Sequence, residues 1–205
     1  LVEGKADYSK GNRFLMPDDG LDDMPWSRML PNAMISFMTK MASGYYKIFD
    51  VVDGFTAITR RAIDLVDWDS AWKGYGYPMD FLVRLNAYGL RVIDVPRRAI
   101  YLEGERQSQI KGLRYALKVT PMLIRNFFWR ILFRYLVRDF HPLLFFYLFG
   151  LLFLPLGVIF GGVLVYQQFD GIGVSGPRAV VCALMVLMGL QFLLFAMLYD
   201  MEESK

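Results

Sequence analysis

The chain has 205 residues, 55% of them hydrophobic, and a formal net charge of +3 at neutral pH. This length accommodates one ordinary domain together with a membrane segment. So small a charge argues against a nucleic-acid-binding protein, and a single cysteine provides neither a disulfide framework nor a metal cluster. The chain starts at Leu1 without a signal-peptide pattern, so we expect further residues to precede it in the natural protein.

The first 120 residues mix polar and apolar side chains with frequent turn signals, which is typical of a water-soluble α/β domain. Apolar residues at helical spacing predict helices at 31–43, 61–66 and 79–88. Strand patterns predict strands at 54–59 and 90–95, with 98–101 as a further candidate. These strands are too few for a complete α/β domain, so we expect only its C-terminal part.

Two long uncharged runs follow, at 142–166 and 179–199. Each is long enough to cross a bilayer core, which needs about 20 apolar residues. Glycines and a proline between the runs predict a short turn, so the runs form a hairpin with both ends on one side. Arginines before the first run outnumber the charges of the turn, which predicts a cytoplasmic N-terminal domain. A buried hairpin in a soluble protein is the alternative interpretation.

The segment 121–140 has the pattern of an amphipathic helix at the membrane surface. Its arginines lie near one helical stripe, among aromatic and aliphatic residues: Arg125, Arg130, Arg134 and Arg138. We expect these arginines to face lipid phosphates. The alternative is an ordinary anchor beside the membrane, without a part in catalysis.

Three groups of polar residues could carry chemistry. Residues 10–13 read as a polar loop in which glycine, lysine and arginine suit a phosphate, although a surface turn fits as well. Asp80 begins a predicted helix, where it could cap the helix or act as a base beside a reacting group. Carboxylates also gather between Asp50 and Asp69. They could bind a metal ion, but turn and capping roles are more common for aspartate.

Taken together, these segments resemble the second half of the family-2 glycosyltransferases, in particular the dolichol-phosphate mannosyltransferase-like group. The resemblance covers roughly residues 7–111. It depends on the order of GNRF at 11–14, WSR at 26–28, DGFTAI at 53–58, DFLVRLN at 80–86 and RVIDVP at 91–96. No single motif is specific, and the resemblance depends on the order and spacing of the motifs together. The interfacial helix and the membrane hairpin also fit this group.

The resemblance implies an inverting, metal-dependent transfer of a hexose from a nucleotide sugar, of the GDP-mannose or UDP-glucose type, to a polyprenyl phosphate. It implies that Arg13, Arg28 and Asn32 face phosphate groups and that Arg106 lies on a loop over the acceptor phosphate. Asp80 matches the family's acidic residue beside the reacting sugar. Substrate-binding roles therefore fall to Arg13, Arg28, Asn32, Asp53 and Arg106, and a catalytic role falls to Asp80.

The chain departs from the family in three respects. Asp53 stands where we expect an asparagine, and Met79 replaces a small polar or acidic residue. The family holds Mg²⁺ or Mn²⁺ with an Asp-x-Asp pair that follows a hydrophobic strand. No such pair follows a hydrophobic strand in this sequence, and Asp67-Trp68-Asp69 lies at a different place. We therefore expect the nucleotide pocket and the metal ligands in a preceding half of the protein.

The expected organisation is an α/β fold in three parts. Residues 1–111 form the C-terminal part of a GT-A-like nucleotide-sugar transferase domain, 112–140 an interfacial amphipathic helix, and 141–205 a transmembrane hairpin with a cytoplasmic tail. A processive polysaccharide synthase, a lipid transporter and a non-catalytic membrane anchor or partner subunit are the competing interpretations. The identity of the sugar and a homo-oligomeric assembly are left open.

Overall fold

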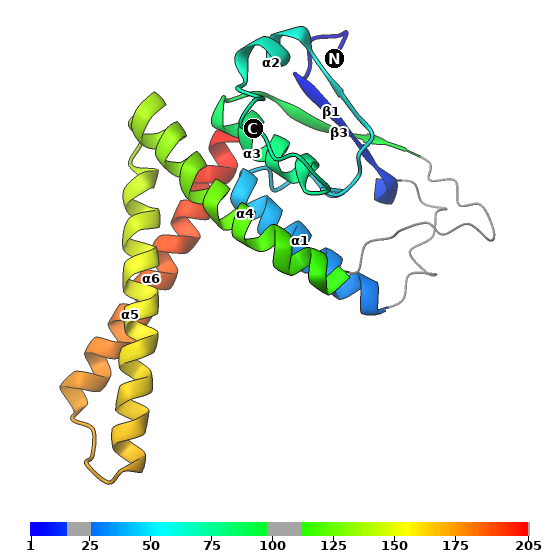
Figure 1. Cartoon of the computed structure of the whole chain (residues 1–205). Helices are drawn as coiled ribbons and strands as arrows, with labels where there is room; N and C mark the ends of the chain where they lie inside the picture. The colour runs from blue at the N-terminus through cyan, green and yellow to red at the C-terminus, as the bar shows by residue number, and fades with distance from the viewer. Residues whose placement is uncertain (16–25, 98–111, 205) are drawn as a thin grey trace. The chain divides into compact units, whose positions relative to one another are not determined.

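The computed structural model describes residues 1–15, 26–97 and 112–204, which fold into two compact units (Figure 1). The first unit contains Leu1–Arg134 and the extreme C-terminus, and the second contains Tyr135–Glu203. The predicted strand at 98–101 lies outside the described residues. The described part of the chain is a mixed α/β structure that is mostly helical.

A small mixed sheet is the centre of the first unit. Its strands are β1 (Tyr8–Asn12), β2 (Thr56–Ile58) and β3 (Val92–Pro96), in the order β2-β1-β3. The central strand β1 runs antiparallel to β2 and parallel to β3, with Tyr8 beside Val92 and Asn12 beside Pro96. The strands predicted at 54–59 and 90–95 are therefore present.

The central strand itself corrects the sequence analysis. Residues 10–12, predicted as a polar loop, form the second half of β1, and Arg13 begins a short 3-10 helix, η1 (Arg13–Leu15). Lys10 and Asn12 are fully buried. A buried strand with polar side chains lacks the apolar alternation by which strands are identified, so the pattern gave no signal for it.

Helices account for the rest of the first unit. They are α1 (Trp26–Ser43), α2 (Arg60–Leu65), α3 (Tyr77–Ala87) and α4 (Gly112–Leu132), and the first three confirm the predicted helices. Thr59 caps α2 by accepting a hydrogen bond from the amide of Ala62. Helix α4 packs against α1 and α3 through Val119, Met122 and Leu123, so it belongs to the folded domain.

The prediction that the four arginines of 121–140 face lipid phosphates is wrong for Arg130. Its side chain is fully buried, donating from Nε to the carbonyl of Ala42 at 2.7 Å and from Nη1 to Asn86 Oδ1 at 3.0 Å. Arg134 also donates to Asn86. Arg125 and Arg138 are exposed. Helical spacing placed the four arginines near one stripe, but it did not show that Arg130 and Arg134 contact residues of α1 and α3.

The second unit is a helical hairpin. A π-helical turn, η2 (Phe133–Arg138), leads from the first unit to α5 (Leu143–Phe169), and α6 (Gly176–Glu203) follows. The two helices approach closely: a Cβ atom on Gly189 would lie 2.4 Å from the amide nitrogen of Leu154. Asp200 is buried in α6, and it accepts hydrogen bonds from the hydroxyls of Tyr135 at 2.6 Å and Tyr147 at 3.2 Å.

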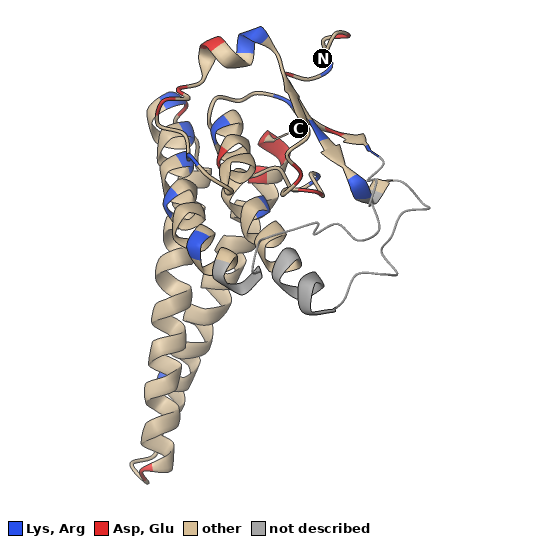
Figure 2. Ribbon diagram, turned by 45° about the vertical axis from the view of Figure 1, so that its right-hand side comes forward, with Lys and Arg blue, Asp and Glu red and all other residues tan. Residues whose placement is uncertain are grey.

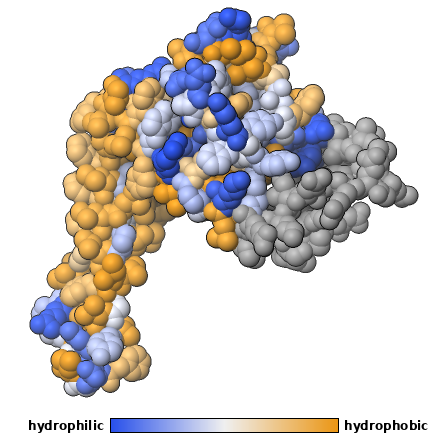
Figure 3. All heavy atoms as spheres, viewed as in Figure 1, coloured by the Kyte–Doolittle hydropathy of each residue, from blue (hydrophilic) through white to orange (hydrophobic). Residues whose placement is uncertain are grey.

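Among the described residues, α5 and α6 are long and apolar enough to cross a membrane. Most of their large apolar side chains are exposed rather than packed, including Val158, Ile159 and Leu187 (Figure 3). A core hairpin of a soluble protein would bury such side chains. The exposure therefore favours lipid as the surroundings of this hairpin.

Replacing Arg130 with methionine is expected to lower the free energy of unfolding by about 3 kcal/mol, because the buried carbonyl and amide groups that it binds lose their donor. Denaturant unfolding of the purified protein measures this. Arg125→Met is the matched control, since Arg125 lies exposed on the same helix, and it should change stability by at most about 0.5 kcal/mol. Equal effects of the two substitutions would contradict the structural role of Arg130.

Candidate functional site

A cluster of charged residues lies where the parallel strands β1 and β3 end. In open α/β sheets, ligands bind beyond the carboxyl ends of the strands. The cluster consists of three cations and three carboxylates with one amide: Lys10, Arg13, Arg97, Asp50, Asp53, Asp94 and Asn12. Figure 2 marks the basic and acidic positions of these elements along the ribbon. We call this set the strand-end cluster.

Each arginine of the strand-end cluster is paired with a carboxylate. Arg13 follows β1 and donates from Nε and Nη2 to the two oxygens of Asp50, at 2.6 and 3.0 Å. Arg97 follows β3 and donates from Nη1 to both oxygens of Asp53, at 2.9 Å each. Asp50 and Asp53 are buried, whereas the arginine side chains remain 33% and 40% exposed. The guanidinium groups therefore lie at the surface with a fixed orientation.

Lys10 lies beneath these pairs. Its Nζ donates to the carbonyl oxygen of Asp53, and the side chain is fully buried. Burial lowers the pKa of Lys10 from its usual 10.5 to about 8, while Asp50, Asp53 and Asp94 act in the opposite direction. The lysine thus ties the loop before β2 to the central strand of the sheet.

Asp94 joins the two parallel strands to the segment after α1. Its Oδ2 atom accepts hydrogen bonds from Asn12 Nδ2 at 2.6 Å and from the amide of Phe49 at 2.9 Å. Burial raises the pKa of Asp94, because the charged carboxylate loses water, and the two hydrogen bonds reduce that effect. Its Oδ1 atom is buried without a hydrogen-bond partner among the described residues.

Gly11 allows the cluster to close over β1. A Cβ atom at this position would lie 3.1 Å from Asp53 Oδ2 and 3.2 Å from Arg97 Cδ. Both distances are shorter than ordinary van der Waals contact, so a side chain at position 11 would push Asp53 and Arg97 away from β1.

The predicted catalytic residue, Asp80, lies in the first turn of α3 and is buried. Its Oδ2 atom accepts from Arg84 Nε at 2.8 Å and from the amide of Trp72 at 2.9 Å, and its Oδ1 atom accepts from Asn126 Nδ2 at 2.6 Å. Asp80 therefore connects α3 to α4 and to the loop before α3. A role beside a sugar remains a prediction.

Of the predicted binding residues, the structure describes the side chains of two. Arg13 and Asp53 come together in the strand-end cluster, with Arg13 Nε 4.0 Å from Asp53 Oδ2. Arg28 and Asn32 are in α1, and their side chains lie outside the described part of the structure, as does Arg106.

Sequence reasoning missed Arg97 and Asp94 as members of the site. The available signal was their position: Asp94 lies in the predicted strand, and Arg97 directly follows the proline that closes it. Asp67, considered as a metal ligand, instead shapes a turn by accepting from the Ser70 hydroxyl at 2.8 Å.

The strand-end cluster has the chemistry of a phosphate-binding surface rather than of a metal centre. Half-exposed arginines present planar donors that suit phosphate oxygens. The carboxylates of Asp50 and Asp53 are engaged by these arginines. Across residues 1–15, 26–97 and 112–204, no group of three or more histidine, cysteine, aspartate or glutamate side chains is arranged to hold a metal ion. The resemblance places the ligands of Mg²⁺ or Mn²⁺ in a preceding half of the protein.

The buried Lys10 predicts a pH dependence of stability. The unfolded chain keeps the lysine proton up to about pH 10.5, whereas the folded chain releases it near pH 8. The unfolded state therefore binds more protons between these values, and stability rises with pH in this window. The unfolding free energy of the wild type minus that of Lys10→Met should increase from pH 8 to pH 10.5.

Chemical denaturation across this range measures the effect, with Lys5→Met as the exposed control. The Lys5→Met difference should stay constant with pH. A Lys10→Met difference that is flat or falls as the pH rises would show that Lys10 is not buried as described.

Comparison with known proteins gives one relative for part of this chain. No protein-family model matches the sequence. Over 103 residues the chain is 28% identical to an uncharacterized protein of Methanocaldococcus jannaschii, an alignment that covers 50% of this chain and 41% of the relative. The matched stretch thus spans less than half of the relative's length, and the chain is similar to that protein over its matched part.

Proposed function

We propose that this chain is the C-terminal part of a membrane-anchored glycosyltransferase that moves a hexose from a nucleotide sugar to a polyprenyl phosphate such as dolichol phosphate. The observation that carries the proposal is the placement of Arg13 and Arg97 at the carboxyl ends of two parallel strands. The ordered resemblance of the sequence to family-2 glycosyltransferases supports the same reaction.

The proposed reaction needs positioned cations more than a strong base. An oxygen of the lipid phosphate attacks the anomeric carbon, and the bond to the nucleoside diphosphate breaks with its electron pair leaving on that group. A phosphate monoester has a second pKa near 6 and is largely charged at neutral pH. The enzyme must therefore orient several phosphate groups and offset their charge. Arg13 supplies a guanidinium group of the required kind at the strand-end cluster.

The metal ion of the proposal is assigned to residues outside this chain. Asp50 and Asp53 are each paired with an arginine, so neither of these two carboxylates is a free metal ligand. A bound Mg²⁺ or Mn²⁺ would neutralise the leaving diphosphate.

A membrane location suits an acceptor whose tail is a long hydrocarbon. Helices α5 and α6 are long and apolar enough to cross the bilayer. Helix α4 exposes an apolar stripe beside the basic Arg125: Leu117, Ile124, Phe128 and Leu132. Such a stripe fits the boundary between headgroups and acyl chains. We assign the first unit to the cytoplasmic face by the positive-inside rule, because Arg138 and its neighbours precede α5.

Arg13→Ala is expected to lower sugar transfer by about a hundredfold, which is the usual cost of losing one positioned donor to a developing charge. The assay uses the full-length protein in membranes with Mg²⁺ or Mn²⁺, polyprenyl phosphate and labelled GDP-mannose or UDP-glucose. Label that moves into the organic phase measures transfer. Arg60→Ala is the control, because Arg60 forms an exposed ion pair on α2, and its activity should match the wild type.

Two outcomes would reject the proposed reaction. Label that accumulates in a long water-soluble polymer would identify a polysaccharide synthase, and no transfer from any donor would favour an anchor or partner subunit.

Asp80→Asn separates a role at the sugar from a role in holding the fold. The substitution keeps the shape of the side chain and removes the charge that pairs with Arg84. We expect Asp80→Asn to lose sugar transfer. The Tm of the same preparation is measured by thermal unfolding. Loss of transfer at an unchanged Tm supports a direct role, whereas loss with a drop in Tm of several degrees assigns Asp80 to positioning.

A further inference from the structure

Two arginines approach one carboxylate oxygen at the end of the sheet. Arg97 Nη1 lies 2.9 Å from Asp53 Oδ2, and Arg13 Nε lies 4.0 Å from the same atom. The register explains this convergence. Asn12 pairs with Pro96, and the amide of Arg97 donates to the carbonyl of Asn12 at 3.1 Å, so Arg13 and Arg97 directly follow paired positions.

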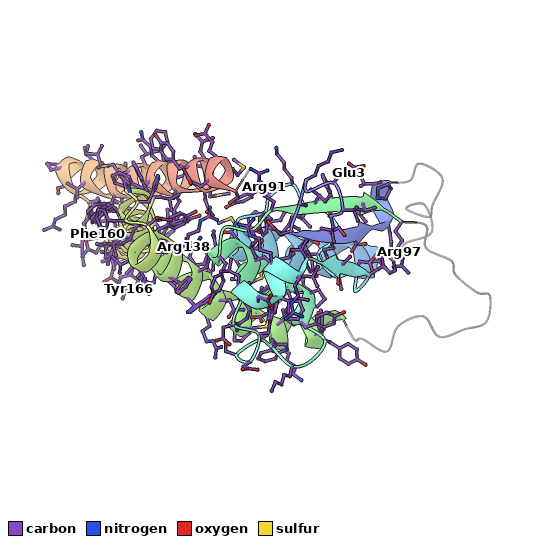
Figure 4. All side chains as sticks on the ribbon, turned by 90° about the horizontal axis from the view of Figure 1, so that it is seen from above. Glu3, Arg91, Arg97, Arg138, Phe160 and Tyr166 are labelled. Atoms are coloured by element: carbon purple, nitrogen blue, oxygen red, sulfur yellow. The ribbon has the colours of Figure 1, made fainter. Side chains whose placement is uncertain are left out.

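Arg97 has the features of a preformed anion-binding group. Its guanidinium carbon lies 5.3 Å from the centre of the Phe55 ring, and its side chain is 40% exposed (Figure 4). Within the part of the chain that the structure describes, the side-chain hydrogen bonds of Arg97 leave from Nη1 alone. The Nε and Nη2 donors of Arg97 can therefore bind an anion as well. A guanidinium held by a carboxylate and an aromatic ring loses little freedom on binding.

Asp53 stands where a bound anion would be expected. Its Oδ1 atom accepts from the amide of Phe55 at 2.9 Å and from Arg97, and its Oδ2 atom faces both arginines. The side chain is 5% exposed. A carboxylate in this position offsets the charge of both guanidinium groups, as a phosphate oxygen would.

We propose that Arg13 and Arg97 together bind one phosphate group of the substrate and that Asp53 competes with that group for the two arginines. The proposal rests on the proposed function for the identity of the substrate. It adds Arg97 and the competing carboxylate to the site. Without ligand, Asp53 holds the guanidinium group of Arg97 and lies 4.0 Å from Arg13 Nε, while Asp50 holds Arg13. The negative charge of Asp53 weakens the binding of the phosphate that replaces it.

Asp53→Asn tests the competition with little change in shape. Asparagine retains an oxygen that can accept from the Phe55 amide while it removes the negative charge. The same substitution gives the uncharged residue that the family resemblance predicts at this position. Phosphate binding should therefore become tighter in Asp53→Asn.

The experiment measures binding by calorimetry to the full-length protein in detergent, without divalent metal. Inorganic pyrophosphate represents the nucleotide diphosphate, and a short-chain isoprenyl monophosphate represents the lipid phosphate. Asp53→Asn should bind one of the two probes about tenfold more tightly than the wild type, which corresponds to about 1.4 kcal/mol. The probe that shows the gain identifies the source of the phosphate group.

Asp64→Asn is the matched control. Asp64 undergoes the same change of charge at an exposed position on α2, and its affinity for both probes should equal that of the wild type. Arg97→Gln should weaken the same probe, and the double variant with Asp53→Asn should lose the tenfold gain. Because Arg97 is half-exposed, Arg97→Gln should fold even if Asp53→Asn does not. The binding of the probe to Arg97→Gln then still tests the proposal.

Equal affinities of Asp53→Asn and Asp64→Asn for both probes would overturn the competition, and wild-type affinity in Arg97→Gln would overturn the two-arginine site. These results are separate from sugar transfer. A gain in Asp53→Asn without transfer would reject the glycosyltransferase reaction alone, whereas transfer without the gain would reject this inference alone.

Discussion

The parallel pairing of β1 with β3 is the constraint on which the candidate site depends. It places Asn12 beside Pro96, and the next residue of each strand is an arginine. A slip of one residue would turn the buried Lys10 toward the opposite face, because side chains alternate along a strand. In this register, Lys10 donates a hydrogen bond to the carbonyl oxygen of Asp53, and Asn12 donates one to Asp94. The strands and the charge cluster therefore stabilise the same arrangement.

The polar interior of the first unit is costly unless its partners remain in place. Lys10, Asp80 and Arg130 are all buried, and each binds groups from distant parts of the sequence. Breaking one such interaction leaves a charge in the interior without compensation. Lys10 thus fixes the loop before β2 to β1, whereas Asp80 and Arg130 join α4 to α3. Apolar residues at these positions would avoid the cost of burying charge. Fixed geometry is what a site for oriented phosphate groups requires.

The sequence predicted those parts of the fold that repeat a simple pattern. Helices α1, α3, α5 and α6 follow from apolar periodicity or from long uncharged runs, and Asp80 falls in the first turn of α3 as expected. Strand β1 did not follow, because its polar residues are satisfied by tertiary contacts that no local pattern contains. The stripe formed by Arg130 and Arg134 was found from spacing, but its burial depends on α1 and α3.

The candidate site was predictable only in part for the same reason. Arg13 and Asp53 were chosen through the resemblance, and the structure brings them together. Their pairings with Asp50 and Arg97 join positions about forty residues apart, and these depend on the sheet register. Arg97 carried no motif of its own, and its position after β3 becomes informative only once β1 is known to lie alongside.

A structure of the full-length protein with a bound nucleoside diphosphate and a polyprenyl phosphate would test the central claim most directly. The account predicts a phosphate group within hydrogen-bonding distance of both Arg13 and Arg97, with Asp53 no longer bridging them. Phosphate groups bound elsewhere, with both arginine–carboxylate pairs unchanged, would contradict it.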